Sequence, residues 1–88
     1  MTHDAVAQSI ATHISADLLG GEPVGPGDDL LLSDLLDSLG VVRLVAHLEA
    51  SYAITIPPED VVLDTMQTAD AIAAYLVRSH NVTEPLPQ

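Results

Sequence analysis

Residues 37–51 read DSLGVVRLVAHLEAS, and this stretch decides the fold. After a polar start, apolar residues recur at steps of three and four, which is the spacing of one face of an α-helix. We expect a helix from about Leu39 to Ser51, with an inward face formed by Val41, Leu44, Val45, Leu48 and Tyr52. A second apolar stripe on another side consists of Leu39, Val42 and Ala46. A helix that is apolar on two sides is either fully buried or presents a docking surface.

The chain before this helix divides into another helix and a long loop. Between residues 4 and 19, apolar side chains follow at steps of four, which predicts a helix that ends at Gly20-Gly21. Its inward residues are Val6, Ile10, Ile14 and Leu18. Residues 22–37 include two prolines and two glycines at their start and cannot continue a regular helix. We expect the leucines of this loop to hold it over the core: Leu30, Leu31, Leu32, Leu35 and Leu36.

The chain after residue 51 predicts two further helical segments. Residues 54–56 alternate like a strand but are too few to stand alone. After two prolines, residues 59–63 suit a single helical turn, and Thr68 is the expected cap of a last helix. The inward residues of that helix are Ala69, Ile72, Ala73 and Leu76. We expect one domain over residues 1–80 and a flexible C-terminal tail over 81–88. The predicted fold is all-α: a small antiparallel helical bundle of three main helices plus one short helix, with a long loop between the first and second helices.

The composition restricts the classes of partner. Two arginines, no lysine and 13 acidic residues give a formal charge of −11 over 88 residues. Nucleic acid and anionic membranes are not expected partners, because binding to phosphate needs basic residues. The acids either keep a small apolar domain dissolved or favour encounters with basic protein surfaces. The absence of cysteine excludes disulfides and thiolate metal sites. The N-terminus does not read as a signal peptide and no apolar run approaches a membrane span, so a cytoplasmic monomer is expected.

A serine stands where the polar, leucine-rich loop gives way to the apolar helix. Residues 28–76 resemble the phosphopantetheine attachment site of acyl and peptidyl carrier proteins. The resemblance rests on the acidic, leucine-rich approach at 28–36, Asp37-Ser38-Leu39-Gly40, Leu48-Glu49, Ile56-Pro57 and the helix start at Thr68. It implies that Ser38 carries a covalent 4′-phosphopantetheine, which a phosphopantetheinyl transferase attaches from coenzyme A. The terminal thiol of that arm holds cargo as a thioester. A phosphodiester at this position would be stabilised by the positive end of the helix.

The helix after Ser38 departs from the fatty-acid type of carrier. Gly40 and Arg43 stand where such carriers commonly place acids, so this helix is more apolar and less acidic. The residues expected to face partners are Asp37, Leu39, Val42, Arg43 and Ala46. Arg43 can equally be a solvated residue without a partner.

The run 35–40, LLDSLG, is similar to stand-alone carriers that work with adenylating ligases, including the D-alanyl carrier type. This resemblance implies a discrete carrier in polyketide or nonribosomal peptide biosynthesis. Its expected partners are an adenylating or acyl-loading ligase and downstream synthase or tailoring enzymes. A D-alanyl carrier-like protein of cell-wall metabolism is an alternative. The residues do not identify the cargo.

The residues also allow functions other than that of a carrier. Ser38 can be a plain helix N-cap in an unrelated protein, or the chain can be a non-covalent acidic adaptor that docks its second helix. We expect no catalytic residues, because the Gly-x-Ser-x-Gly turn is absent and His47 lies more than two helical turns beyond Ser38. We also expect no metal site: His13 and Asp17 supply only two ligands, and both are interpreted as surface residues.

Overall fold

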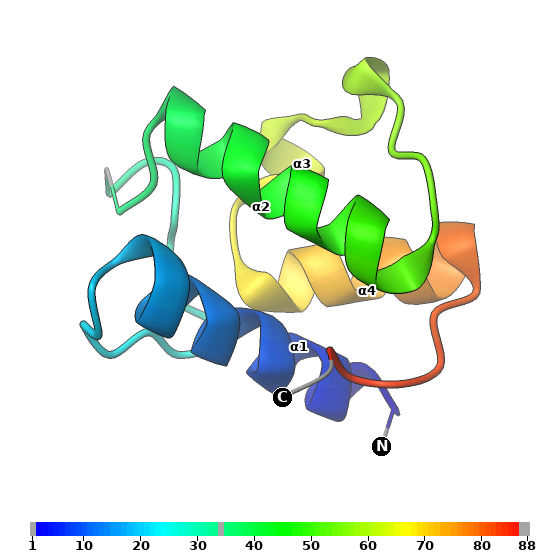
Figure 1. Ribbon diagram of the computed structural model, residues 1–88, viewed down its shortest axis with the longest axis horizontal. Coiled ribbons are helices and arrows are strands. Elements are labelled where there is room, and N and C mark those ends of the chain that lie inside the picture. Colours follow the sequence, from blue (N-terminus) through cyan, green and yellow to red (C-terminus); the bar gives the residue numbers. More distant parts are fainter. Residues whose placement is uncertain (1, 34, 87–88) are drawn as a thin grey trace.

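The computed structural model describes residues 2–33 and 35–86, and it is all-α as predicted. The helices are α1 (Thr2–His13), which continues as a π-helical turn over Ile14–Leu18, then α2 (Ser38–Tyr52), α3 (Leu63–Met66) and α4 (Ala69–His80). A 3₁₀ turn, Pro58–Asp60, precedes α3. Figure 1 shows α1 running opposite to both α2 and α4. The part of the chain described here contains no strand, so residues 54–56 are simply an extended connection.

The first helix changes its winding after three turns. Val6, Ile10 and Ile14 are fully buried, as the four-residue step predicts. The π-helical turn then shifts the register, with the N–H of Leu19 donating to the carbonyl of Ile14 at 3.0 Å, and Leu18 is only half-buried. Gly20 and Gly21 follow with φ of +65° and +97°, a left-handed conformation that glycine adopts without steric cost. The helix therefore ends where the sequence predicts.

The inward face predicted for α2 is confirmed. Leu44 and Leu48 are buried, and the other three inward residues are half-buried against the core. The helix ends at Ala53, which is left-handed with φ of 53° and whose N–H bonds to the carbonyl of Glu49. The Glu49 carboxylate then accepts the N–H of Ile56 at 2.7 Å, which fixes the chain as it leaves the helix.

The short helix begins later than the sequence indicated. We expected a turn over residues 59–63, but that region is a 3₁₀ turn followed by extended backbone at Val62, and α3 starts at Leu63. The Thr65 hydroxyl explains the shift, because it donates to the carbonyl of Asp60 at 2.5 Å and accepts the N–H of Val62 at 3.3 Å. The cap of α4 agrees with the prediction: Thr68 Oγ1 accepts the N–H of Ala71 at 3.0 Å.

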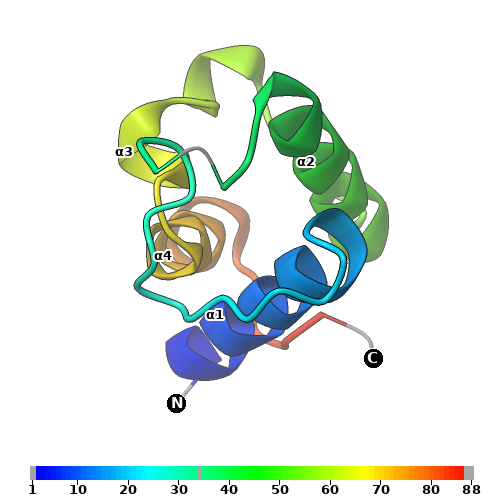
Figure 2. The same cartoon turned by 90° about the vertical axis from the view of Figure 1, so that its left-hand side faces the viewer.

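The long loop between α1 and α2 lies beside the α3–α4 side of the bundle (Figure 2). It is fastened there by backbone bonds, among them the N–H of Asp70 to the carbonyl of Pro26 at 2.9 Å. Leu30 and Leu36 are buried, whereas Leu32 is 68% exposed. The expectation that all five loop leucines hold the loop to the core is therefore wrong for Leu32. Its neighbour Leu31 is bent inward by the turn at Asp29, and Leu32 points to solvent.

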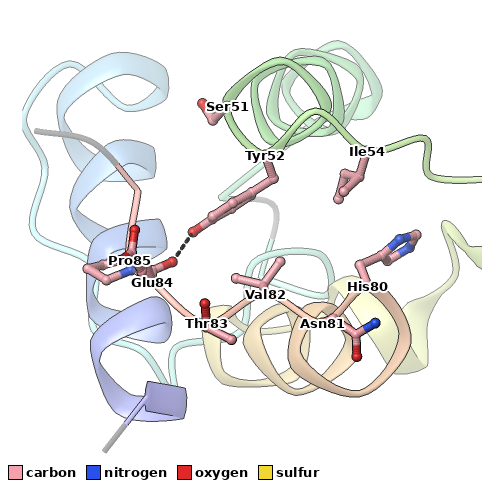
Figure 3. Close-up of a pocket in the computed structure, with 9 residues that line it drawn as sticks. All are labelled: Ser51, Tyr52, Ile54, His80, Asn81, Val82, Thr83, Glu84 and Pro85. Atoms are coloured by element: carbon pink, nitrogen blue, oxygen red, sulfur yellow. Dashed lines mark hydrogen bonds between the residues drawn. The ribbon is translucent and has the colours of Figure 1, made fainter.

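The segment after α4 is packed, although we expected a flexible tail from residue 81. Val82 and Leu86 are 6% and 3% exposed, and the N–H of Leu86 donates to the Ser9 hydroxyl on α1 at 2.9 Å. The Tyr52 hydroxyl on α2 donates to the carbonyl of Glu84 at 2.9 Å (Figure 3). The segment 81–86 thus crosses between α2 and α1 and contributes two side chains to the core. Residues 87 and 88 lie outside the described residues.

Candidate functional site at the start of helix α2

Ser38 is the first residue of α2 but it is not the cap of the helix. The cap is Asp37, whose extended backbone places its carboxylate Oδ1 2.7 Å from the N–H of Gly40. The Ser38 side chain is exposed, and its hydroxyl makes no hydrogen bond within residues 2–33 and 35–86. The interpretation of Ser38 as a plain N-cap is therefore wrong. The neighbouring aspartate does the capping, and the serine hydroxyl is left free to react.

The backbone around Ser38 suits an anion. The first-turn N–H groups of Gly40 and Val41 are satisfied by the side chain and the carbonyl of Asp37. The N–H groups of Ser38 and Leu39 have no partner in the part of the chain that the structure describes. They lie at the positive end of a helix of 15 residues, where a phosphodiester on the serine oxygen would be favoured.

Gly40 allows two neighbouring side chains to lie close to the backbone of α2. A Cβ at this position would lie 3.2 Å from Cδ2 of Leu36 and 3.3 Å from Oδ1 of Asp37. The side chain of Leu36 is buried directly beneath the start of the helix. Glycine therefore lets the buried leucine and the capping carboxylate approach the helix backbone together.

An apolar hollow adjoins the serine. It has a volume of about 290 Å³ and is lined by Ser38 and Val41 of α2, Leu31 of the loop and the α3 region around Leu63 and Met66. A larger groove of about 490 Å³ continues along α2 and shares Val41 and Val61 with the hollow. An exposed hydroxyl at a helix N-terminus, next to an apolar groove, is suited to carrying a group that is attached covalently and partly sheltered.

The comparison with known families agrees with this geometry. The family described as "Phosphopantetheine attachment site" matches residues 8–76 of the 88 residues. The chain belongs to this family. Its members bear a covalent 4′-phosphopantetheine and are modified by a phosphopantetheinyl transferase; they are carriers and not catalysts. Comparison with curated proteins and with solved structures found no match.

The partner-facing residues predicted for the carrier lie together on its surface. Leu39 and Val42 are 56% and 62% exposed, and Asp37, Arg43 and Ala46 are exposed as well. Val62 and Leu63, at the start of α3, are further exposed apolar side chains that sequence reasoning missed. Arg43 forms no ion pair within the described ranges 2–33 and 35–86. Of the predicted stripe, Val42 and Ala46 also line the groove, so they are shared between its wall and the outer surface.

The environment of His13 differs from the one expected from the sequence. It was interpreted as a surface residue, but it is half-buried and its ring stacks on that of His47 across the α1–α2 interface. Its Nδ1 lies 2.8 Å from Oδ2 of Asp17. Burial, followed by the charge of His47, lowers the pKa of the His13 imidazole, while Asp17 acts in the opposite direction. No group of three metal-binding side chains is found among the residues that the structure describes.

Sequence reasoning missed one side-chain contact between the loop before α2 and the α3–α4 junction. Asp29 in the loop and Gln67 between α3 and α4 are joined through their side chains, 2.9 Å from Oδ2 to Nε2. A pair separated by 38 positions gives no periodic signal in the sequence. The acidic, leucine-rich approach to Ser38 was noticed as a motif, but the contact that Asp29 makes could not be read from it. In the described ranges, no helix has the length and apolar character needed to cross a membrane.

Proposed function

We propose that the protein is a discrete acyl or aminoacyl carrier that holds biosynthetic intermediates as thioesters on a phosphopantetheine arm attached to Ser38. The observation that carries this proposal is the division of roles at the start of α2. Asp37 caps the helix, while the Ser38 hydroxyl is exposed and makes no hydrogen bond to the residues that the structure describes. In the transfer, Ser38 Oγ bonds to the pantetheine-bearing phosphorus of coenzyme A. The phosphoanhydride bond breaks, adenosine 3′,5′-bisphosphate leaves, and the hydroxyl proton passes to a base of the transferase or to water.

The finer parts of the proposal concern partners. We propose that an adenylating or acyl-loading ligase loads the arm. Synthase or tailoring enzymes of polyketide or nonribosomal peptide biosynthesis then use the cargo. The apolar stripe of α2, with Arg43 in place of an acid, supports a partner surface that differs from the strongly basic one suited to acidic carriers. A D-alanyl carrier-like role in cell-wall metabolism uses the same loading chemistry. The proposal includes that the carrier is cytoplasmic and monomeric.

The decisive experiment is an intact mass measurement after incubation with coenzyme A and a broad-specificity phosphopantetheinyl transferase. The wild-type chain should gain one phosphopantetheine and Ser38→Ala should gain none. Ser33→Ala is the matched control, because Ser33 is an exposed serine of the same approach loop. It should be modified like the wild type. Modification of Ser38→Ala would move the attachment point elsewhere.

A second candidate is a non-covalent adaptor, which the exposed side chains of Leu39 and Val42 would also suit. Such a protein would bind a partner through α2 without a covalent arm. The mass measurement separates the two functions. No mass gain with several different transferases, together with binding that survives Ser38→Ala, would favour the adaptor.

A further inference from the structure

The loop that leads to Ser38 is joined to the α3–α4 junction by one pair of side chains. Gln67 Nε2 donates to Oδ2 of Asp29 at 2.9 Å, while the other oxygen of Asp29 accepts the backbone N–H groups of Leu31 and Leu32 at 3.0 and 2.7 Å. We refer to the Asp29–Gln67 pair as the loop latch. The hydrogen bond from Gln67, with the backbone bonds after it, holds the pKa of Asp29 below its usual value, so this side chain is an acceptor at neutral pH.

Backbone hydrogen bonds connect the loop latch to the start of α2, where Ser38 lies. The N–H of Leu30 donates to the carbonyl of Gln67 at 2.7 Å, so the same two segments are joined twice. The carbonyl of Leu30 then accepts the N–H of Leu36 at 2.8 Å. Leu36 is the buried side chain on which Gly40 and the first turn of α2 rest. The position of the first turn of α2 therefore depends on where the latch holds the loop.

The latch also reaches the opposite side of the hollow beside Ser38. The N–H of Gln67 donates to the carbonyl of Leu63 at 3.0 Å, which makes Gln67 the C-cap of α3. Leu63 and Met66 of α3 line the hollow, and so does Leu31, whose N–H is held by Asp29. The latch, together with the backbone bond from Leu30 to Gln67, thus joins the loop wall and the α3 wall of the same hollow.

We propose that Asp29 and Gln67 are positioning residues for the transfer of phosphopantetheine to Ser38, which rests on the function proposed above. Neither residue belongs to α2, and neither lines the groove to which Val42 contributes, so we expect them to act on the presentation of the hydroxyl and not on docking. Loosening the latch lets the start of α2 and α3 move apart, and the serine oxygen then meets the transferase in a wider range of orientations. Since group transfer depends steeply on alignment, the loss should fall mainly on kcat.

The test exploits the chemistry of the pair. Gln67→Glu places two carboxylates face to face and removes the donor, so kcat for modification should fall about tenfold with KM for the carrier little changed. Asp29→Asn alone should be mild, because the Gln67 amide can turn over and accept the new N–H while Oδ1 keeps its backbone bonds. Combining Asp29→Asn with Gln67→Glu should bring kcat back to within about threefold of wild type, because the new amide donates to the new carboxylate.

Two matched controls separate this contact from charge alone. Gln8→Glu adds the same charge at an exposed position of α1 and should leave kcat unchanged. Asp28→Asn combined with Gln67→Glu restores the net charge but leaves the facing carboxylates, because the Asp28 carboxylate accepts the N–H of Gly25 in its own turn and, among the described residues, does not bond to Gln67. That combination should not recover kcat. Equal recovery with Asp28→Asn and Asp29→Asn, or a Gln67→Glu rate within twofold of wild type, would overturn the proposal.

A second readout does not depend on modification. Amide hydrogen exchange at Leu30 and Leu36 should become faster in Gln67→Glu and return to the wild-type rate when Asp29→Asn is added. If the wild type takes up no phosphopantetheine, the proposed function fails. The exchange rates still test whether the Asp29–Gln67 contact holds the loop, and unchanged exchange in Gln67→Glu would overturn that role. Should Gln67→Glu not fold, Gln67→Met keeps the side-chain length without the donor. It should show the same loss with no recovery on adding Asp29→Asn.

Discussion

The imidazole rings of His13 and His47 lie parallel, with their centroids 3.7 Å apart and their planes at 9°. This stack joins the last turn of α1 to the middle of α2, the helix that carries Ser38. His47 Nε2 is 3.3 Å from the Ser51 hydroxyl, and Asp17 faces His13 from the π-helical turn. Two stacked imidazoles cannot both be protonated without repulsion, so this contact is sensitive to pH.

The pH dependence of unfolding has a defined sign. The pKa of His13 is lowered in the folded protein, so its contribution is fully present above the unfolded value of about 6.5 and is lost as pH falls through the folded pKa. Between pH 8 and 5, wild type should lose a few tenths to about 1 kcal/mol relative to His13→Gln. Urea unfolding at several pH values measures this difference. His3→Gln, at the exposed His3–Asp70 pair, should leave the dependence as it is in the wild type. Identical pH profiles for wild type and His13→Gln would contradict the prediction.

Val42 and Leu48 should separate docking from stability. Leu48 is fully buried, so Leu48→Ala should destabilise the fold by about 2–5 kcal/mol. Val42 is 62% exposed, so Val42→Asp should change stability by less than about 1 kcal/mol while slowing loading or modification. Thermal melts and loading rates on both variants check this. Equal melting losses would show that the two faces of α2 are misassigned.

Arg43 should influence the choice of partner through its charge. Arg43→Glu is expected to slow loading by the cognate ligase and to improve recognition by fatty-acid-type enzymes, with a larger effect at low salt because encounter rates depend on charge. Arg78→Glu is the matched control, since Arg78 is the other arginine and is exposed near the end of α4. Loading rates at low and high salt give the answer. If neither the rate nor its salt dependence changes at position 43, Arg43 is a solvated residue without a role in docking.

The segment after α4 should contribute to stability. Leu86 is 3% exposed and its N–H bonds to Ser9, so Leu86→Ala should cost about 2 kcal/mol or more in the free energy of unfolding. Pro85→Ala, at an exposed neighbouring position, should cost much less. Denaturant titrations compare the two. A Leu86→Ala variant as stable as the wild type would return residues 81–86 to the status of a loose tail.

Local patterns predicted the helices well because each signal lies within one turn or one face. The burial of Val6, Ile10 and Leu48 follows from spacing, and Thr68 is recognisable as a cap from its own position. Ser38 was identified as the candidate residue from the motif around it. Two adjacent residues with capping side chains, Asp37 and Ser38, could not be told apart, because one residue of register decides which oxygen reaches the backbone.

What the sequence could not predict are contacts between distant segments. The bond of Leu86 to Ser9 spans 77 positions, and the latch between Asp29 and Gln67 spans 38. Residues 81–86 are rich in polar residues and proline, which is a composition typical of a flexible tail. The burial of Leu86 becomes visible only in the folded bundle. His13 looked like a surface residue for the same reason, because its stacking partner lies on another helix.

Gly40 limits how the charge of this carrier can be altered. The acid that fatty-acid-type carriers commonly place here would need room for a Cβ that lies 3.2 Å from Leu36 and 3.3 Å from the capping carboxylate of Asp37. Grafting an acidic recognition surface onto this scaffold therefore also involves the interior, because the ends of the Leu36 and Asp37 side chains have to shift by a few tenths of an ångström to admit a side chain at position 40. A change of surface charge at position 40 is in this carrier also a change of the packing beneath α2, so the two properties are not independent modules there.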